Sequence, residues 1–239
     1  TTNNISLTAG STYDWMLDSP TPFAGSSYGV GNYAVLNPLD KGTNLVCTNG
    51  NLSVSNSVSE STDRMCRSSF GMVSGKYYWE LNVNNSASVD IVGIAAADAN
   101  VNVYLAGSGN AFGWGISTST GNFYGNSTYP YNFYGASPYP AFPSSGIIGI
   151  AFDADTGKLW FSSNNTWLNT TGGAGNPSSG TNPMFQYTGP AIAFFPAVSV
   201  RNNTGSWIFN FGQRPFAYTP PSGFKSLCTY NLPTPTIQN

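Results

Sequence analysis

The chain has 239 residues, of which only 8% are charged and 15% are aromatic, and its formal net charge is −2. This length suits one large β domain, and the aromatic content excludes a disordered chain, because disorder accompanies few aromatic residues and a high net charge. The sequence has no run of three basic residues and no apolar run of about 18 residues, which argues against nucleic-acid binding and against a membrane span.

The N-terminal part, residues 1–50, is rich in turn signals such as "DSPTPF" and "LNPLD". We expect it to be loop-rich and to pack on the domain that follows, residues 51–224. Strand signals begin in that domain. "KYYWELNV" (76–83) alternates large and polar residues, and "VDIVGIAAAD" (89–98) is a more continuous apolar run, as expected of a central strand.

Strand signals continue along the second half of the domain. "FGWGIST" and "GNFYG" form a predicted strand pair joined by a turn, and "GIIGIAFDADTGKLWFSS" (146–163) is the clearest hairpin in the chain. "AFFPAVSV" and "GSWIFNFG" complete the set. Helical periodicity is nearly absent. The pattern therefore predicts an all-β fold, a two-sheet antiparallel β-sandwich. Trp79, Trp114, Trp160 and Trp207 lie in these strands and are predicted to be core or sheet-face residues.

The end of the chain is punctuated by prolines, which cannot donate to a sheet ladder in a central strand. We expect it to pack as extended chain over a sheet edge and then to leave the domain as a linker, residues 225–239.

One segment between two predicted strands has a distinct composition. Residues 122–146, "NFYGNSTYPYNFYGASPYPAFPSSG", are dense in Tyr, Phe and Pro and carry no charge. A connection this long is usually functional or disordered, and its aromatic content argues against disorder. We predict a binding surface made of its tyrosines, with a self-packed cover over a sheet as the alternative. Tryptophans in turn-like contexts extend the predicted contact set, which is Tyr124, Tyr129, Tyr131, Tyr134, Tyr139, Trp15 and Trp167.

The acidic pair in the hairpin, Asp153 and Asp155, raises the question of a calcium site. Calcium takes six to eight oxygen ligands and usually a downstream Glu, which this sequence does not provide. A turn explains the pattern better, with the aspartates as caps and Gly157 at a positive φ angle. We therefore expect no metal ion and no cofactor at this turn.

The sequence offers little for catalysis. It contains no histidine, which removes Ser-His-Asp and Cys-His arrangements. A glycan hydrolase would need two facing carboxylates, and only two glutamates exist, Glu60 and Glu80. We expect Glu80 to be paired within a sheet, with an arginine as its partner, and the chain not to be an enzyme. Cys47, Cys66 and Cys228 are expected to be free thiols, with one disulfide and one leftover thiol as the alternative.

The strands in order resemble the SPRY (B30.2-like) domain. The resemblance covers roughly residues 74–224, and its most specific pieces are the triplets Tyr78-Trp79-Glu80 and Asn210-Phe211-Gly212. The other matching stretches are "VGIAAAD", "GWGISTSTGNFY", "IIGIAFDADTGKLWFSSNNTW", "FPAVSV" and "IFNFGQRPFAYTPPSGF". The resemblance implies a concanavalin A-like sandwich of two antiparallel sheets.

The flanking stretches narrow the resemblance. "NNISLTAGSTYDWMLDSPTPF", "NYAVLNPLD" and "FKSLCTYNLPTPTI" are similar to stretches that flank SPRY domains in bacteriophage structural and tail-fibre proteins. This resemblance implies a virion location, on a tail fibre or the capsid, and a chain that is part of a longer protein. The implied function is non-catalytic recognition of a host cell-surface glycan or protein. The alternative is a structural element that contacts other virion proteins, with a homo-oligomer, a trimer in a fibre, as a further expectation.

Overall fold

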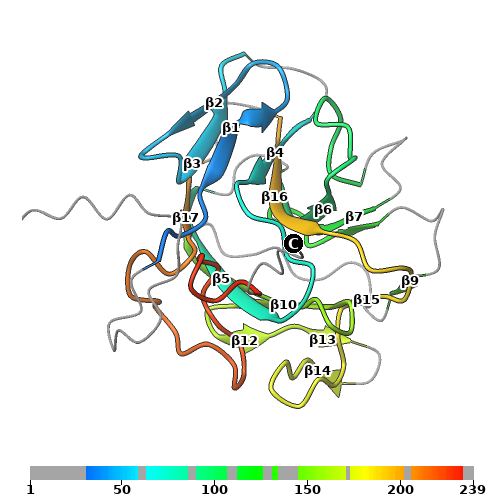
Figure 1. The fold of residues 1–239 in the computed structure, drawn as a ribbon. Helices are drawn as coiled ribbons and strands as arrows, with labels where there is room; N and C mark the ends of the chain where they lie inside the picture. The colour runs from blue at the N-terminus through cyan, green and yellow to red at the C-terminus, as the bar shows by residue number, and fades with distance from the viewer. Residues whose placement is uncertain are drawn as a thin grey trace, which may run out of the picture.

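A computed structural model describes residues 31–58, 63–85, 90–106, 112–125, 131–133, 145–170, 173–201 and 206–233. In these ranges the chain forms the predicted all-β sandwich of antiparallel sheets (Figure 1). The same ranges contain no helix that is long and apolar enough to cross a membrane.

The first sheet has six strands in the order β1-β4-β16-β6-β7-β8. Their bounds are Leu36–Lys41 (β1), Arg64–Ser68 (β4), Phe194–Val200 (β16), Ile91–Ala96 (β6), Gly113–Ser117 (β7) and Phe123–Gly125 (β8). The predicted strand–turn–strand at residues 112–125 is confirmed, because β7 and β8 pair antiparallel.

The second sheet has seven strands, six of them in the order β17-β5-β10-β11-β15-β9, with β12 paired to β11. Their bounds are Ser206–Asn210 (β17), Lys76–Asn85 (β5), Gly146–Asp153 (β10), Lys158–Ser163 (β11), Thr166–Trp167 (β12), Phe185–Tyr187 (β15) and Tyr131–Phe133 (β9). The predicted hairpin is confirmed in full: β10 and β11 pair without a register shift from Ile148↔Ser163 to Asp153↔Lys158.

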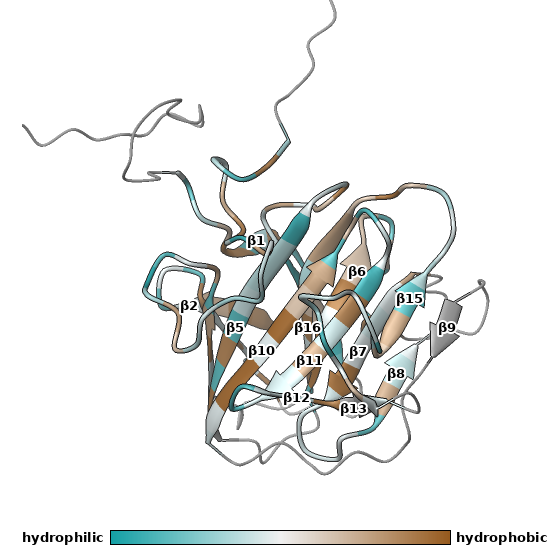
Figure 2. Cartoon of the chain, turned by 90° about the horizontal axis from the view of Figure 1, so that it is seen from below, coloured by the Kyte–Doolittle hydropathy of each residue, from teal (hydrophilic) through white to brown (hydrophobic). Residues whose placement is uncertain are grey.

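The core lies between these two sheets because the strands alternate their side chains across the pleat. On β5, Tyr77, Trp79, Leu81 and Val83 enter the main core, while Tyr78 and Glu80 lie on the outer face. Figure 2 shows the resulting hydrophobic bands along β10, β16 and β7. The four predicted core or sheet-face tryptophans are all buried: Trp79, Trp114, Trp160 and Trp207.

A proline sits in the central strand β16, where the ladder normally needs every N–H. Phe194 exchanges backbone hydrogen bonds with Met72 on the β4 side. Pro196, two residues further on, turns its nitrogen to that same side, where β4 ends at Ser68. Pro196 thus lies just before the pairs that β16 makes with β4, which begin at Ala197↔Arg67, and its missing N–H does not interrupt that ladder.

The two open sides of the sandwich are closed by different segments. On one side, the hairpin of β2 (Leu45–Thr48) and β3 (Ser53–Asn56) lies between the edge strands β1 and β17 (Figure 1). On the other side, the segment predicted as one long connection supplies both edge strands, β8 to the first sheet and β9 to the second. β8 had been predicted as a strand, whereas β9 is a strand within the stretch predicted as a connection.

The outer face of the second sheet is covered by chain that follows β17. Lys225 pairs in parallel with Tyr77 of β5, beyond the end of β17. Phe216 and Phe224 pack against Tyr78 and Trp160 on the outer face. We call this covering stretch, residues 215–225, the strap. A separate small pair of strands, β13 (Asn169–Thr170) and β14 (Gly173–Ala174), follows β12 in the chain.

Glu80 holds the strap in place, and its partners differ from the predicted arginine. Its buried carboxylate accepts hydrogen bonds from the N–H groups of Ala217 (2.8 Å) and Tyr218 (2.9 Å) and from the hydroxyl of Tyr78 (3.0 Å). A carboxylate satisfied by three donors needs no cation beside it, and backbone donors that arrive from a distant turn leave no sequence signal.

Candidate functional site

The turn between β10 and β11 answers the question raised by its aspartates. Oδ1 of Asp153 accepts from the N–H groups of Asp155 (3.1 Å) and Thr156 (3.3 Å), and Oδ2 lies 3.3 Å from Nζ of Lys76. Oδ1 of Asp155 accepts from the N–H of Gly75 (2.8 Å). Gly157 has a φ of 69°, as predicted. These carboxylates cap a turn, and within the described ranges no three metal-ligating side chains come together.

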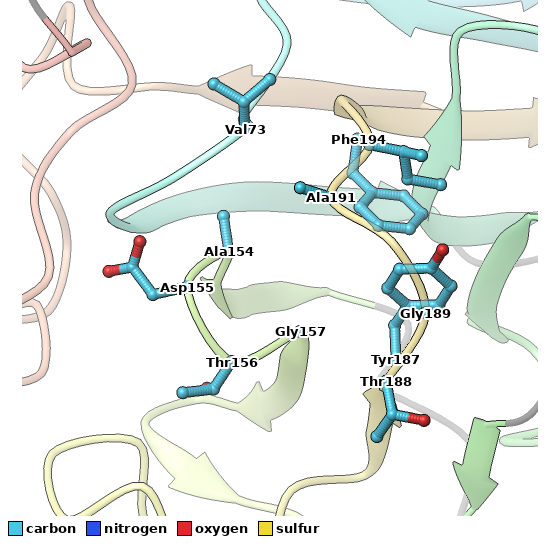
Figure 3. Close-up of a pocket in the computed structure, with 11 residues that line it drawn as sticks. Val73, Ala154, Asp155, Thr156, Gly157, Tyr187, Thr188, Gly189, Ala191 and Phe194 are labelled. Carbon is cyan, nitrogen blue, oxygen red and sulfur yellow. The ribbon is translucent and has the colours of Figure 1, made fainter.

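A cleft of about 260 Å³ lies beside this turn (Figure 3). Residues Ala154–Gly157 form one wall, and the segment from Tyr187 to Phe194 forms the other, with the rings of Tyr187 and Phe194 facing the space. Val73, whose side chain is 52% exposed, lies at the rim. Asp155 is the one charged residue in the lining, and Figure 3 shows its carboxylate pointing away from the two rings.

The walls of the cleft are held by local hydrogen bonds. The hydroxyl of Tyr187 donates to the carbonyl of Pro190 (2.9 Å), which fixes the bend of its own segment. The N–H of Tyr187 donates to the carbonyl of Gly157 (2.8 Å), and Gln186 donates to the carbonyl of Thr156 (3.2 Å). The two walls are therefore tied at their base, and the cleft exists before any partner arrives.

A second, more apolar hollow of about 170 Å³ continues from the first. Its lining is Ala96, Ala97, Asp98, Phe112, Ile192 and Ala193. Ile192 lines both hollows, so the segment 188–193 separates them as a low ridge. Together they make a largely uncharged surface, which we call the end cleft.

The sequence did not single out the residues of the end cleft. They come from three stretches that are distant in the chain, and pairing at the sheet ends brings them together. One signal was present: "TGPAIAFF" places apolar residues, Ala191 and Ile192, directly after a Gly-Pro turn, where polar residues are usual. In the structure Ala191 is exposed and Ile192 is half-buried.

The predicted contact residues fall into several places. Trp167 is half-buried and packs edge-on against Tyr78, with ring centroids 6.5 Å apart, on the outer face near the strap. Tyr124 is half-buried and packs edge-on against Tyr104 at 5.9 Å. Tyr131 is the first residue of β9. The remaining predicted residues, Trp15, Tyr129, Tyr134 and Tyr139, lie outside the described ranges.

One predicted residue connects the tyrosine-rich segment to the end cleft. In the β15–β9 pair, Tyr131 stands opposite Tyr187, whose ring lines the cleft. The chain passes directly from β15 into the ridge 188–193. The structure does not join Trp167 to this surface, because Trp167 packs in the outer-face cluster with Trp160 and Phe224.

Glu80, the one glutamate in the described ranges, is not free to act in a hydrolytic pair. Glu80 has its oxygens occupied by the strap and by Tyr78, and Glu60 lies outside those ranges. A hollow of about 190 Å³ beside Glu80 is lined by strap and sheet residues, including Asn82, Asn210 and Arg214. Asn210 uses its side chain on the same turn, since it accepts from the N–H of Gly212 (3.0 Å) and donates to the carbonyl of Pro215 (3.1 Å).

Comparison with known proteins gives one family and one fold. The model of the SPRY domain family matches residues 76–214. The SPRY domain of human HERC1 aligns at a TM-score of 0.50 and 16% identity, covering 75% of this chain and 99% of that chain. The TRIM65 PSpry domain aligns at 0.52 and 12%, covering 75% and 90%. At these identities the solved structures establish the fold alone. No protein of curated function matches the sequence.

Proposed function

The chain belongs to the SPRY domain family, and we propose that it is a non-catalytic module that binds a protein segment at the end cleft. Domains of this family are generally protein-interaction modules and are typically non-catalytic. The observation that carries the proposal is the end cleft itself: a preformed hollow with apolar residues on its rim, whose charged residues are Asp98 and Asp155.

The chemistry of the end cleft suits one apolar side chain of a partner, flanked by its backbone. Burying a Val- or Leu-sized side chain there contributes about 1.5–3 kcal/mol. The cleft has little charge to desolvate, and its walls are already tied, so a partner loses little to reorganisation. Tyr131, in the tyrosine-rich segment, stands opposite Tyr187 in the β15–β9 ladder, and this supports the segment as a further part of the proposed contact area.

Peptide selection tests this proposal although the natural partner is unidentified. Peptides selected from a random library on the intact chain should bind at least tenfold more weakly to Val73→Asp and to Ala191→Glu, since each places a charge in the contact. Both positions are exposed, so both variants should fold. Leu39→Asp is the matched control, because Leu39 is 95% exposed and lies on β1, outside the cleft lining. Peptides that bind the unmodified chain and all three variants equally would refute the end cleft as the binding surface.

At a finer level, we propose that the module belongs to a bacteriophage particle and recognises a host cell-surface protein or glycan. The resemblance of the flanking stretches to those of phage structural and tail-fibre proteins supports this. The purified module should then bind host cells and compete with particle adsorption. If it instead remains buried in the particle and does not compete, the alternative holds, in which it is an assembly or decoration element that contacts other virion proteins.

A non-catalytic role agrees with the structural roles of three acidic side chains. Glu80 serves the strap, and Asp153 and Asp155 cap a turn. A hydrolase that used one of these three groups would require it to be released from its donors. Cleavage of a host polysaccharide by the intact chain, abolished by Glu80→Gln in a folded variant, would overturn this part of the proposal.

A further inference from the structure

Two of the three cysteines lie side by side, although 19 positions separate them in the chain. Sγ of Cys47, on β2, is 3.8 Å from Sγ of Cys66, on β4. Both are free thiols; Cys66 is buried and Cys47 is partly exposed. Cys228 is elsewhere, with its sulfur near Ser226 (3.7 Å) and Asn231 (3.3 Å).

The two sulfurs are in van der Waals contact, and a movement of the side chains would be needed to join them. A disulfide has an S–S length of about 2.0 Å, so the sulfurs must approach by about 1.8 Å. Rotation of the two side chains about χ1 moves each sulfur over a comparable distance.

The two thiols have unequal chemistry. The hydrogen bond from Cys66 lowers the pKa of the Cys47 thiol, and the Lys41 ammonium acts in the same direction. The same hydrogen bond, together with burial, raises the pKa of the Cys66 thiol. Cys47 is thus the better nucleophile and the more accessible one, and Cys66 stands behind it as a resolving thiol.

We propose that Cys47 and Cys66 form a redox-active pair that a peroxide converts to a disulfide, clipping the β2–β3 hairpin to the first sheet. In the first step the Cys47 sulfur attacks the peroxide O–O bond, giving a sulfenic acid and releasing water. In the second step the Cys66 sulfur attacks the Cys47 sulfur, and the hydroxyl leaves as a second water. Two thiols and one hydrogen peroxide thus give one disulfide and two waters.

The position of the hairpin gives this clip a structural consequence. The carbonyl of Asn51 accepts from the N–H of Leu36 on the first sheet (2.8 Å), and the carbonyl of Leu52 accepts from the N–H of Phe209 on the second (2.8 Å). The hairpin therefore bridges the two sheets along one open side, and Val54 enters the core. A covalent bond to β4 would fasten that side of the sandwich.

Peptide mapping tests the pairing directly. The chain is treated with a small excess of hydrogen peroxide, its remaining thiols are alkylated, and it is digested with trypsin. Cleavage after Lys41, Arg64 and Arg67 puts Cys47 in peptide 42–64 and Cys66 in peptide 65–67. We expect these two peptides to be linked by a disulfide, with Cys228 alkylated. Linkage of Cys228 to either cysteine, or alkylation of all three, would overturn the pairing.

Thermal unfolding tests whether the disulfide stabilises the sandwich by joining the β2–β3 hairpin to the first sheet. Closing a loop of this length should raise Tm by roughly 5–10 °C in the oxidised chain relative to the reduced chain. Cys47→Ser should abolish the rise, and its half-buried position makes it the safer variant for folding. Cys228→Ser is the matched control and should keep the rise. A mapped Cys47–Cys66 disulfide without an increase in Tm would overturn the clip.

Discussion

At the scale of single residues, Gly157 shows how one turn position depends on both conformation and space. Its φ of 69° favours glycine, and a Cβ there would collide with the carbonyl oxygen of Tyr187, which sits on the wall of the end cleft. The sequence predicted the conformation from the Asp-Thr-Gly pattern. The collision depends on β15, which is distant in the chain, so no local pattern could reveal it.

Gly157→Ala should therefore destabilise the chain by more than the conformational penalty alone. We expect a loss of about 3 kcal/mol or more, of which about 1 kcal/mol comes from the positive φ angle. Gly50→Ala is the matched control, since Gly50 has a φ of 64° and open space around it. Gly50→Ala should lower the free energy of unfolding only by the part that comes from the positive φ angle. Urea unfolding of both variants measures the difference, and equal losses would contradict the collision.

The same turn predicts the response to chelation. Because both aspartates already accept hydrogen bonds from backbone donors, EDTA should leave Tm unchanged and added Ca²⁺ should not raise it. Differential scanning fluorimetry with and without each reagent is sufficient. A drop of several degrees in EDTA, reversed by Ca²⁺, would restore the calcium interpretation.

Tyr77 sets a limit to stability in alkaline solution. Burial, assisted by the nearby Asp155 carboxylate, raises the pKa of Tyr77 to about 12, and burial with Glu80 raises the pKa of Tyr78 as well. The unfolded chain ionises both near its ordinary pKa of about 10. Their contribution to stability is therefore complete below pH 10 and is lost as the pH rises from 10 through 12.

We expect the free energy of unfolding to fall over that interval, by up to about 1.4 kcal/mol per pH unit for each of the two tyrosines. Tyr77→Phe should make the fall shallower, because a phenyl ring does not titrate. Urea unfolding at pH 9, 10, 11 and 12 measures the slope. An unchanged slope in Tyr77→Phe would show that this tyrosine is not responsible.

At the scale of elements, the triplets Tyr78-Trp79-Glu80 and Asn210-Phe211-Gly212 act together to hold the strap on the second sheet. Glu80 stands opposite Asn210 in the β17–β5 ladder. Glu80 receives the strap at Ala217 and Tyr218, while Asn210 shapes the turn at Gly212 that sends the chain there. The motif residues therefore build the cover of the second sheet, and the end cleft is made by other residues.

Glu80→Gln should weaken this fastening strongly. The amide keeps one acceptor oxygen and turns an NH₂ group toward a donor, so one N–H loses its partner inside the protein. We expect a loss of about 2–4 kcal/mol in urea unfolding. Asp155→Asn is the control, since Asp155 is exposed and its amide oxygen can still accept from Gly75. It should cost less than about 1 kcal/mol. Equal effects would contradict a special role for the Glu80 carboxylate.

The elements that the sequence predicted are those with strong local alternation. The hairpin of β10 and β11 carries its own turn and its own period of two, and β5 and β6 follow apolar patterns. Strands with three residues or fewer, such as β9 and β15, exist only because a distant strand pairs with them. The end cleft forms where such strands end, so its position could not be predicted from local sequence patterns.

At the scale of the whole molecule, the sandwich is closed on both sides by chain that is not part of its central strands. The β2–β3 hairpin bridges one side, and the tyrosine-rich segment supplies β8 and β9, the edge strands of the two sheets on the other side. The two sides differ in chemistry. One holds the cysteine pair, and the other lies next to the end cleft through β15. The side proposed to be stabilised by a disulfide and the side proposed for binding are thus separated across the width of the sheets.

This separation predicts that the tyrosine-rich segment contributes to stability and to binding through different residues. Phe123 stacks on Phe185 with ring centroids 6.4 Å apart and packs against the core, so Phe123→Ala should cost about 2–3 kcal/mol in urea unfolding. The triple variant Tyr129→Ala, Tyr131→Ala and Tyr134→Ala should instead weaken binding of a selected peptide by at least tenfold and leave Tm within a few degrees. Tyrosines offer wide apolar faces with a hydroxyl at the rim, and the prolines among them restrict the chain before binding. Peptide affinity and urea unfolding, measured on both variants, distinguish the binding contribution from the stability contribution. A triple variant that binds normally would confine recognition to the end cleft, and one that unfolds would make the tyrosines part of the closure, as Phe123 is.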